Sequence, residues 1–325
     1  MISRKTRILL LGLPPDGPIK RYMPEISRRA PDLEVVVTQD EAEITPVLDR
    51  VEICAGHLPR KLIPDAPALR WLQLWGAGVD WLLEHPAVKG SAVVITNASG
   101  VHPVPISEHI FAMILALGRG IATAVRAQTA RQWRRCSSEE ISELAGKTML
   151  LVGLGAIGTR TARIARAFDM SVLGVRKNPS KPAPEVEEVH GPDALSSLLP
   201  RSDYVVLTLP LTRETTGLIG GKELRSMKAS AILVNIGRGR IVDEPALVRA
   251  LSEGWIAGAA LDVFEEEPLP SASPLWQMEN VVVTAHYAGI TPRYFERAME
   301  IFLDNLRRYQ HGEPLRNVVD KQLGY

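Results

Sequence analysis

Short apolar runs alternate with longer helical patterns along most of this 325-residue sequence, and this alternation limits the fold more than any other feature. Near-continuous apolar runs are typical of strands buried on both faces, and helices between them connect parallel strands. Five runs lie before residue 100: Ile8–Leu13, Leu33–Val37, Val51–Ala55, Leu69–Leu74 and Ala92–Thr96. Six lie after residue 147: Thr148–Val152, Ser171–Val175, Tyr204–Leu209, Ala231–Asn235, Ala257–Leu261 and Val281–Thr284. The sequence therefore predicts an α/β protein with two doubly wound parallel sheets.

A long apolar helix, roughly Ile106–Leu117, separates the two sets of runs. It is entered through Pro103-Val-Pro, with Ser107 as a candidate cap, and we interpret it as a connector between two lobes. An amphipathic helix at about Thr291–Gln310 follows the last run, which suggests that the chain crosses back to the first lobe. We expect one domain from residues 1–102 and 291–325 and a second from residues 103–290.

Composition excludes several classes of protein. Apolar residues make up 46% and charged residues 23%, which is a soluble globular composition, and the net charge of +1 gives no general attraction to nucleic acid or membranes. Cys54 and Cys136 have no metal-ligand spacing, so we expect no metal and a reducing compartment. The run Ile8–Leu13 is too short for a secretory signal, and no stretch is long enough for a membrane span. We therefore expect a cytoplasmic protein.

The segment Gly153-Leu-Gly155-Ala-Ile-Gly158 places the pattern G-x-G-x-x-G between an apolar run and a helical pattern. The first glycine allows a tight turn, the second lets the backbone approach a pyrophosphate, and the third lets helix and strand pack closely. Free N–H groups at the start of the helix, at Ala156 and Ile157, would then face the phosphates. With five further strands in the right order, this turn predicts a dinucleotide-binding domain.

The residues after the next strand bear on which dinucleotide is bound. NAD enzymes usually carry a carboxylate about 20 residues beyond the turn, where it accepts hydrogen bonds from the ribose. This sequence has Arg176 and Lys177 instead, at the place where a 2′-phosphate would lie. A solvated loop would also explain two cations, but the missing acid and the added arginine together favour NADP, with NAD still possible.

Polar side chains follow three successive strands of the second set: Arg238, then Asp262 and Glu267, then His286. In an open α/β sheet, ligands bind at the carboxyl ends of the strands. A guanidinium can hold the carboxylate of a 2-oxo or 2-hydroxy acid, and a histidine can exchange a proton with the substrate oxygen. A buried Glu267 beside His286 would favour the protonated imidazole. Each residue alone also fits a structural role, but together they favour a site of hydride transfer.

The chain resembles the D-isomer-specific 2-hydroxyacid dehydrogenase family over nearly its whole length. The motifs that carry this resemblance are Trp75-Gly-Ala-Gly-Val-Asp80, Gly153-Leu-Gly-Ala-Ile-Gly158, Leu209-Pro-Leu-Thr212, Asn235-Ile-Gly-Arg238-Gly239, Asp262-Val-Phe-Glu265 with Glu267-Pro268, and His286.

The resemblance implies a Rossmann cofactor domain, a smaller flavodoxin-like substrate domain, and homodimers formed through the cofactor domain. It implies that Arg238 orients the substrate, that His286 is the general acid and base, and that Glu267 is its partner. Ala77 and Gly78 would offer backbone N–H groups to the substrate carboxylate. The cofactor contacts implied beyond the glycine turn and Arg176 are Lys177, Leu209, Pro210, Ile236 and Asp262.

The leading hypothesis is an NADP-preferring reductase of glyoxylate or hydroxypyruvate, because Arg176 resembles the subset of such reductases that prefer NADPH. One alternative is a dinucleotide-sensing, corepressor-like binding protein of the same fold. Another is a dehydrogenase of this family for formate, phosphite or a sugar-acid phosphate. The sequence ends soon after Asn317-Val-Val-Asp320, from which we expect no regulatory domain of the kind found in many phosphoglycerate dehydrogenases.

Overall fold

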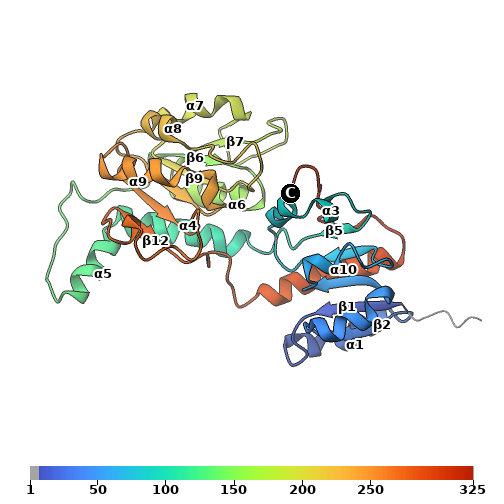
Figure 1. The fold of residues 1–325 in the computed structure, drawn as a ribbon. Coiled ribbons are helices and arrows are strands. Elements are labelled where there is room, and N and C mark those ends of the chain that lie inside the picture. Colours follow the sequence, from blue (N-terminus) through green and yellow to red (C-terminus); the bar gives the residue numbers. More distant parts are fainter. Residues whose placement is uncertain (1–6, 325) are drawn as a thin grey trace, which may run out of the picture. The chain divides into compact units, whose positions relative to one another are not determined.

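The computed structural model describes residues 7–324, so the predicted domain ends at residues 1 and 325 lie outside the described residues (Figure 1). The chain separates into two compact units. One takes in the residues up to Val101 together with those from Thr291 onward, and the other is His102–Ile290. Each unit is a parallel sheet with helices, as the alternation of runs predicts.

The discontinuous unit contains a five-stranded parallel sheet in the order β2-β1-β3-β4-β5. This is the flavodoxin-like order of a doubly wound sheet, so the predicted fold class is confirmed for this unit. Its strands are β1 (Ile8–Gly12), β2 (Glu34–Val37), β3 (Val51–Gly56), β4 (Trp71–Gln73) and β5 (Val94–Thr96). Its α-helices are α1 (Met23–Arg29), α2 (Glu41–Ile44), α3 (Pro86–Lys89) and α10 (Tyr294–Gln310).

Helix α10 completes the core of this unit from the far end of the chain. Met299, Phe302 and Leu306 are buried in one cluster with residues of β1, β3 and β4. The ring of Phe302 stacks on Trp71 of β4 with centroids 5.8 Å apart. The amphipathic pattern of the sequence thus corresponds to a helix whose apolar face covers the first sheet.

The continuous unit contains a seven-stranded parallel sheet in the order β12-β11-β10-β9-β6-β7-β8. This order contains the Rossmann arrangement, which confirms the predicted fold class. The strands are β6 (Thr148–Val152), β7 (Ser171–Val175), β8 (Glu188–His190), β9 (Tyr204–Leu207), β10 (Ile232–Asn235), β11 (Gly258–Leu261) and β12 (Val281–Val283). The sequence predicted six of these strands and missed β8. This strand is short, partly exposed and mostly polar, because it lies at the edge of the sheet.

The helices of this unit are α4 (Pro103–Gly118), α5 (Ile121–Thr129), α6 (Ala156–Ala167), α7 (Leu195–Leu198), α8 (Gly221–Ser226) and α9 (Glu244–Ser252). The prediction that Ser107 caps α4 is wrong. The helix already begins at Pro103, because proline suits the first helical position and needs no hydrogen-bond acceptor there. Ser107 is buried inside the helix, where its hydroxyl donates to the Val104 carbonyl at 3.0 Å.

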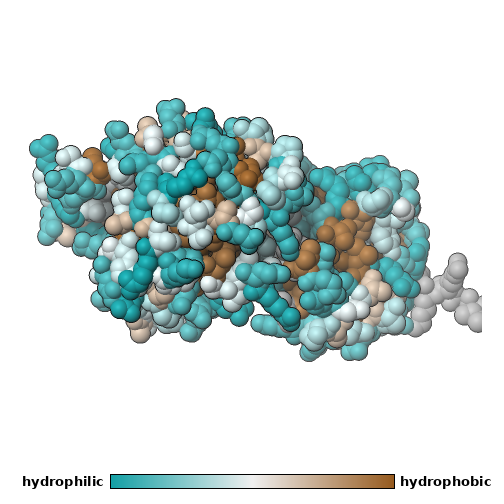
Figure 2. Space-filling model, turned by 90° about the horizontal axis from the view of Figure 1, so that it is seen from above, coloured by the Kyte–Doolittle hydropathy of each residue, from teal (hydrophilic) through white to brown (hydrophobic). Residues whose placement is uncertain are grey.

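Most side chains on the visible face of the space-filling view are hydrophilic (Figure 2). Within residues 7–324, no single helix has the length and apolar character needed to cross a membrane. Helices α4 and α5 meet that criterion only as a pair, by length and composition, and the chain bends by 69° between them.

Candidate active site

Two glycines of the turn between β6 and α6 are required by close packing. A Cβ at Gly153 would lie 2.8 Å from the hydroxyl oxygen of Thr208, and the backbone there has a φ of 110°. A Cβ at Gly158 would lie 2.1 Å from the carbonyl oxygen of Gly153. The strand and the helix therefore approach each other more closely than any side chain permits.

Gly155 differs from these two, because a Cβ there would meet no atom within 4 Å. It is the residue before α6, and no side chain caps the start of that helix. The first N–H groups of α6, at Ala156 and Ile157, have no acceptor within the helix. Open space beside uncapped N–H donors fits the pyrophosphate of a dinucleotide.

Arg176 and Lys177 follow β7 at the same edge of the sheet. The guanidinium of Arg176 donates to the carbonyl of Lys181, and its Nε atom is buried without a hydrogen-bond partner among residues 7–324. Lys177 is exposed. The pKa of Glu214 is lowered mainly by the hydrogen bond from Thr212, and the charge of Lys177 lowers it further, so Lys177 and Glu214 are neighbours.

The remaining apolar residues predicted at the cofactor site follow the neighbouring strands. Leu209 and Pro210 come after β9, and Ile236 comes after β10, where it is buried. A Cβ on Gly237 would lie 2.8 Å from the carbonyl oxygen of Leu209. The two strand ends are therefore in close backbone contact.

Arg238 stands at the end of a turn that Asn235 shapes. The side chain of Asn235 accepts from the Gly237 N–H at 3.1 Å and donates to the Arg238 carbonyl at 3.0 Å. One guanidinium nitrogen of Arg238 donates to the Gly237 carbonyl at 2.7 Å. Burial lowers the pKa of His102, and the charge of Arg238 lowers it further, which places this histidine near the guanidinium. His102 is not among the site residues that the sequence predicts.

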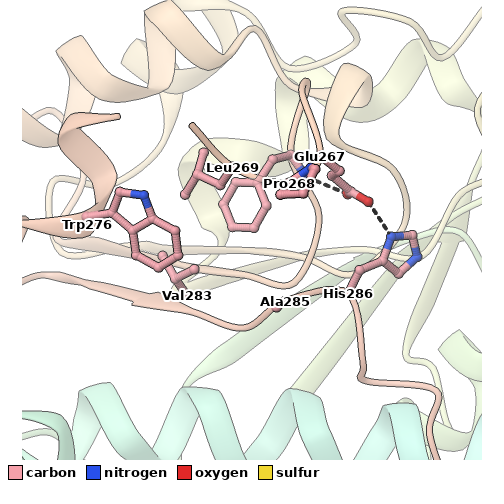
Figure 3. Close-up of a pocket in the computed structure, with 8 residues that line it drawn as sticks. Glu267, Pro268, Leu269, Trp276, Val283, Ala285 and His286 are labelled. Atoms are coloured by element: carbon pink, nitrogen blue, oxygen red, sulfur yellow. Dashed lines mark hydrogen bonds and ion pairs between the residues drawn. The ribbon is translucent and has the colours of Figure 1, made fainter. Parts of the chain in front are cut away.

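His286 and Glu267 form a direct pair (Figure 3). Nδ1 of His286 lies 2.6 Å from Oε2 of Glu267, whose other oxygen accepts from the Phe264 N–H at 3.0 Å. Because a carboxylate can only accept, Nδ1 carries a hydrogen and Nε2 is left for other chemistry. The side chains of His286 and Glu267 are 49% and 35% exposed in this unit, so the glutamate is not a buried one.

Both residues line a hollow of about 430 Å³ in this unit. Its other walls are mainly apolar and include Phe264, Leu269, Trp276 and Val283 (Figure 3). The polar pair of His286 and Glu267 therefore lies in mainly apolar surroundings, at the carboxyl ends of β11 and β12.

Asp262 holds the backbone of the His286 loop. His286 has a left-handed φ of 53°, and its N–H donates to the Asp262 carbonyl at 2.8 Å. The buried carboxylate of Asp262 accepts from the N–H groups of Tyr287 and Ala288 at 3.0 and 3.1 Å. The carboxylate thus fixes a strained conformation that a free loop would leave.

A chain of side chains continues from Asp262 into α4. The Thr284 hydroxyl donates to Asp262 at 2.6 Å, and its oxygen lies 3.0 Å from Nε2 of His109. Burial lowers the pKa of His109, and the charge of Asp262 only partly opposes this. A neutral His109 therefore donates through Nε2–H to Thr284. Neither Thr284 nor His109 is among the site residues that the sequence predicts.

The structure brings the glycine turn, Arg176, Arg238, Asp262, Glu267 and His286 into one unit, at the carboxyl ends of its parallel strands. Ala77 and Gly78 belong to the other unit, in the loop that follows β4, where Gly78 is exposed and Ala77 partly buried. Among residues 7–324, no group of three or more His, Cys, Asp or Glu could hold a metal ion.

Three comparisons with known proteins agree with one another. The sequence model of the family described as D-isomer specific 2-hydroxyacid dehydrogenase, NAD binding domain, matches residues 111–288. The glyoxylate reductase of Korarchaeum cryptofilum is 34% identical over 322 residues, which is 94% of this chain and 96% of that protein.

Two solved structures are similar over whole chains. A D-isomer specific 2-hydroxyacid dehydrogenase from Xanthobacter autotrophicus, in complex with NADPH and MES, has a TM-score of 0.82 at 30% identity and covers 98% of this chain and 100% of its own. An NADPH-dependent glyoxylate/hydroxypyruvate reductase from Sinorhizobium meliloti, in complex with NADP and sulfate, has a TM-score of 0.83 at 27% identity and covers 99% and 100%.

Proposed function

The chain belongs to the D-isomer specific 2-hydroxyacid dehydrogenase family, and on that premise we propose that it reduces glyoxylate or hydroxypyruvate with NADPH. Membership makes it an oxidoreductase that transfers a hydride between a nicotinamide cofactor and a small 2-oxo or 2-hydroxy acid. The relatives named above are reductases and dehydrogenases, so the corepressor alternative has no support among them.

The pair of His286 and Glu267 carries the proposal. Reduction of a 2-oxo acid adds a hydride to the carbonyl carbon and a proton to the carbonyl oxygen, and a bound nicotinamide supplies the hydride. Because Glu267 holds Nδ1–H at 2.6 Å, Nε2 is the atom through which His286 delivers the proton. In the reverse direction the same nitrogen accepts the proton of the 2-hydroxy acid.

Arg238 is proposed to orient the substrate. Its guanidinium suits a planar carboxylate or 2-oxo group, because parallel N–H donors match paired oxygens. The Asn235 amide fixes the turn from both sides, so the backbone that carries Arg238 is held before substrate binds. Ala77 and Gly78 are proposed to bind the substrate carboxylate through their N–H groups.

Preference for NADPH rests on Arg176 and Lys177. Both stand after β7, where no acid is present to accept hydrogen bonds from a ribose. The buried, unpartnered Nε of Arg176 is a donor that an anionic 2′-phosphate would satisfy. We also propose that the protein is a cytoplasmic homodimer, in keeping with its two free cysteines and the exposed apolar side chains of α5.

An initial-rate panel tests this function. Glyoxylate, hydroxypyruvate, pyruvate and phosphohydroxypyruvate are each reduced with NADPH and with NADH, and formate and phosphite are assayed with the oxidised cofactors. We expect the highest kcat/KM for glyoxylate or hydroxypyruvate with NADPH. Turnover confined to formate or phosphite, or binding of nucleotide without turnover of any 2-oxo acid, would refute the proposal.

A further inference from the structure

We propose that Asn97 is a positioning residue for the substrate loop, residues 75–80, because Asn97 and Ala98 hold the two peptide groups that would present N–H donors to the substrate carboxylate. This inference rests on the proposed function, in which the N–H groups of Ala77 and Gly78 bind a 2-oxo acid. Asn97 directly follows β5 in the same unit as the loop.

Both peptide groups are held through their carbonyl oxygens. The carbonyl of Gly76 accepts from the Ala98 N–H at 3.0 Å, and the carbonyl of Ala77 accepts from Nδ2 of Asn97 at 2.8 Å. In a planar trans peptide the C=O and the N–H point in opposite directions. Holding the two carbonyls against one turn therefore directs the N–H groups of Ala77 and Gly78 away from that turn, toward the same side.

Neither of these N–H groups donates to another residue in the part of the chain that the structure describes. Successive backbone N–H groups with a common direction form a concave donor site for an anion. A carboxylate offers two oxygens to such a pair. The direction of these two N–H groups thus depends on how firmly the carbonyls of Gly76 and Ala77 are held.

Asn97 is itself fixed from several directions. The residue is only 7% exposed, and its side-chain Oδ1 accepts from the Ser99 N–H at 3.0 Å. Its N–H donates to the Asn317 carbonyl at 3.1 Å. Nδ2 of Asn317 donates to the carbonyls of Asn97 and Ser99 at 3.2 and 2.8 Å. Asn317 therefore stabilises the turn at residues 97–99, and this turn in turn holds the two carbonyls of the substrate loop.

A structural role alone would predict a different effect from a positioning role. Asn305 provides the comparison, because it is also a buried asparagine that binds the C-terminal segment. It accepts from the Arg316 N–H at 2.7 Å and donates to the Arg316 carbonyl at 3.0 Å. It also donates to Oε1 of Gln73, the last residue of β4, at 3.3 Å, but within the described residues it has no hydrogen bond to residues 75–80. Loss of Asn305 should lower Tm without changing how substrate binds.

The experiment compares Asn97→Ala with Asn305→Ala in the full-length protein. For Asn97→Ala we expect the KM for glyoxylate to rise about tenfold, as for the loss of ~1.4 kcal/mol of binding free energy. The expected kcat stays within about threefold, because interactions shared by ground and transition states change KM alone. The Kd of NADPH, measured by fluorescence, should not change. Asn305→Ala should keep the wild-type KM.

A binding measurement separates this inference from the proposed function. Oxamate, an unreactive analogue of a 2-oxo acid, is titrated into the NADPH-loaded protein, and its Kd should rise with the Asn97→Ala change as KM does. Wild-type protein that neither turns over 2-oxo acids nor binds oxamate would overturn the proposed function. An active wild type with unchanged KM and oxamate Kd in Asn97→Ala would overturn the role of Asn97 alone.

Asn317→Gly covers the case in which Asn97→Ala does not fold. Asn317 has a φ of 55°, which glycine adopts without strain, so this variant removes only the side-chain braces. We expect a smaller rise in the KM for glyoxylate, about threefold, because only the hydrogen bonds from Asn317 Nδ2 to the carbonyls of Asn97 and Ser99 are lost. An unchanged KM in this folded variant would also contradict the inference.

Discussion

His286 combines three properties that few histidines share. It has a left-handed backbone, its Nδ1 lies 2.6 Å from a carboxylate oxygen, and its side chain is 49% exposed. Strain of this kind persists only where the surroundings enforce it, and here the enforcing group is Asp262. The proton-transfer role proposed for His286 therefore depends on a buried acid that never needs to meet the substrate.

Replacing His286 by alanine should lower kcat for glyoxylate by about 10²- to 10⁴-fold, the usual contribution of a positioned general acid. The Kd of NADPH should stay close to the wild-type value, because the glycine turn is unaffected. His190→Ala is the matched control, since His190 forms a comparable pair with Glu188 at 2.9 Å on the edge strand β8. A wild-type kcat in the His286→Ala variant would show that His286 is not the proton donor.

Replacing Arg176 by aspartate should change which cofactor is preferred. The carboxylate would repel a 2′-phosphate and accept hydrogen bonds from ribose hydroxyls, so the ratio of kcat/KM for NADPH over NADH should fall at least about tenfold. Arg201→Asp makes the same charge change at an arginine that pairs with Glu188. If both variants keep the wild-type ratio, the phosphate is recognised by other residues.

The sequence predicted the site residues that stand at strand ends, because a buried run followed by a polar residue marks such an end. It could not find residues that act through distant partners. Asn97 and Asn317 are 220 positions apart, and His109 and Thr284 are 175 positions apart. No local pattern reports those contacts, and the asparagines look like ordinary turn residues until the chain is folded.

Among the elements, eight of the eleven predicted apolar runs extend past the strands that they contain. Strand β9 ends at Leu207, although the apolar run continues to Leu209. The residues beyond the ladder turn toward the neighbouring strand end, as the contact of Leu209 with Gly237 indicates. Apolar character therefore predicts burial, and burial continues from the sheet into the loops around the site.

Strand β8 gives the opposite case. Glu188 and His190 would not be assigned to a buried strand, yet the segment pairs in parallel with β7 from Leu173 to Val175. An edge strand has one free side and needs no continuous apolar run. The sequence predicts interior strands well for this reason, and edge strands poorly.

At the level of the whole molecule, α5 and the chain after it extend away from the sheet of their unit (Figure 1). Ile121 and Val125 of this helix are exposed, and Trp133 is 95% exposed. Apolar groups of this size gathered on one projection are typical of an interface. The proposed homodimer would cover them with a second copy of the chain.

Substituting Val125 by lysine and Trp133 by glutamate together should convert the dimer to a monomer in sedimentation velocity at micromolar concentration. The introduced charges would be buried without partners in the proposed interface, at a cost of several kcal/mol. Val318→Lys, which places a charge on an exposed valine of the other unit, should leave the dimer intact. A double variant that sediments like the wild type would place the interface elsewhere.

The return of α10 to the first sheet also bears on how the protein is made. On the ribosome, β1 to β5 emerge before β6 to β12, yet Trp71 cannot stack on Phe302 until α10 has been synthesised. The continuous unit, His102–Ile290, has all its own residues by then. Of the two units, the one whose strands emerge first is therefore completed second, and until then the face of its sheet that α10 covers stays exposed.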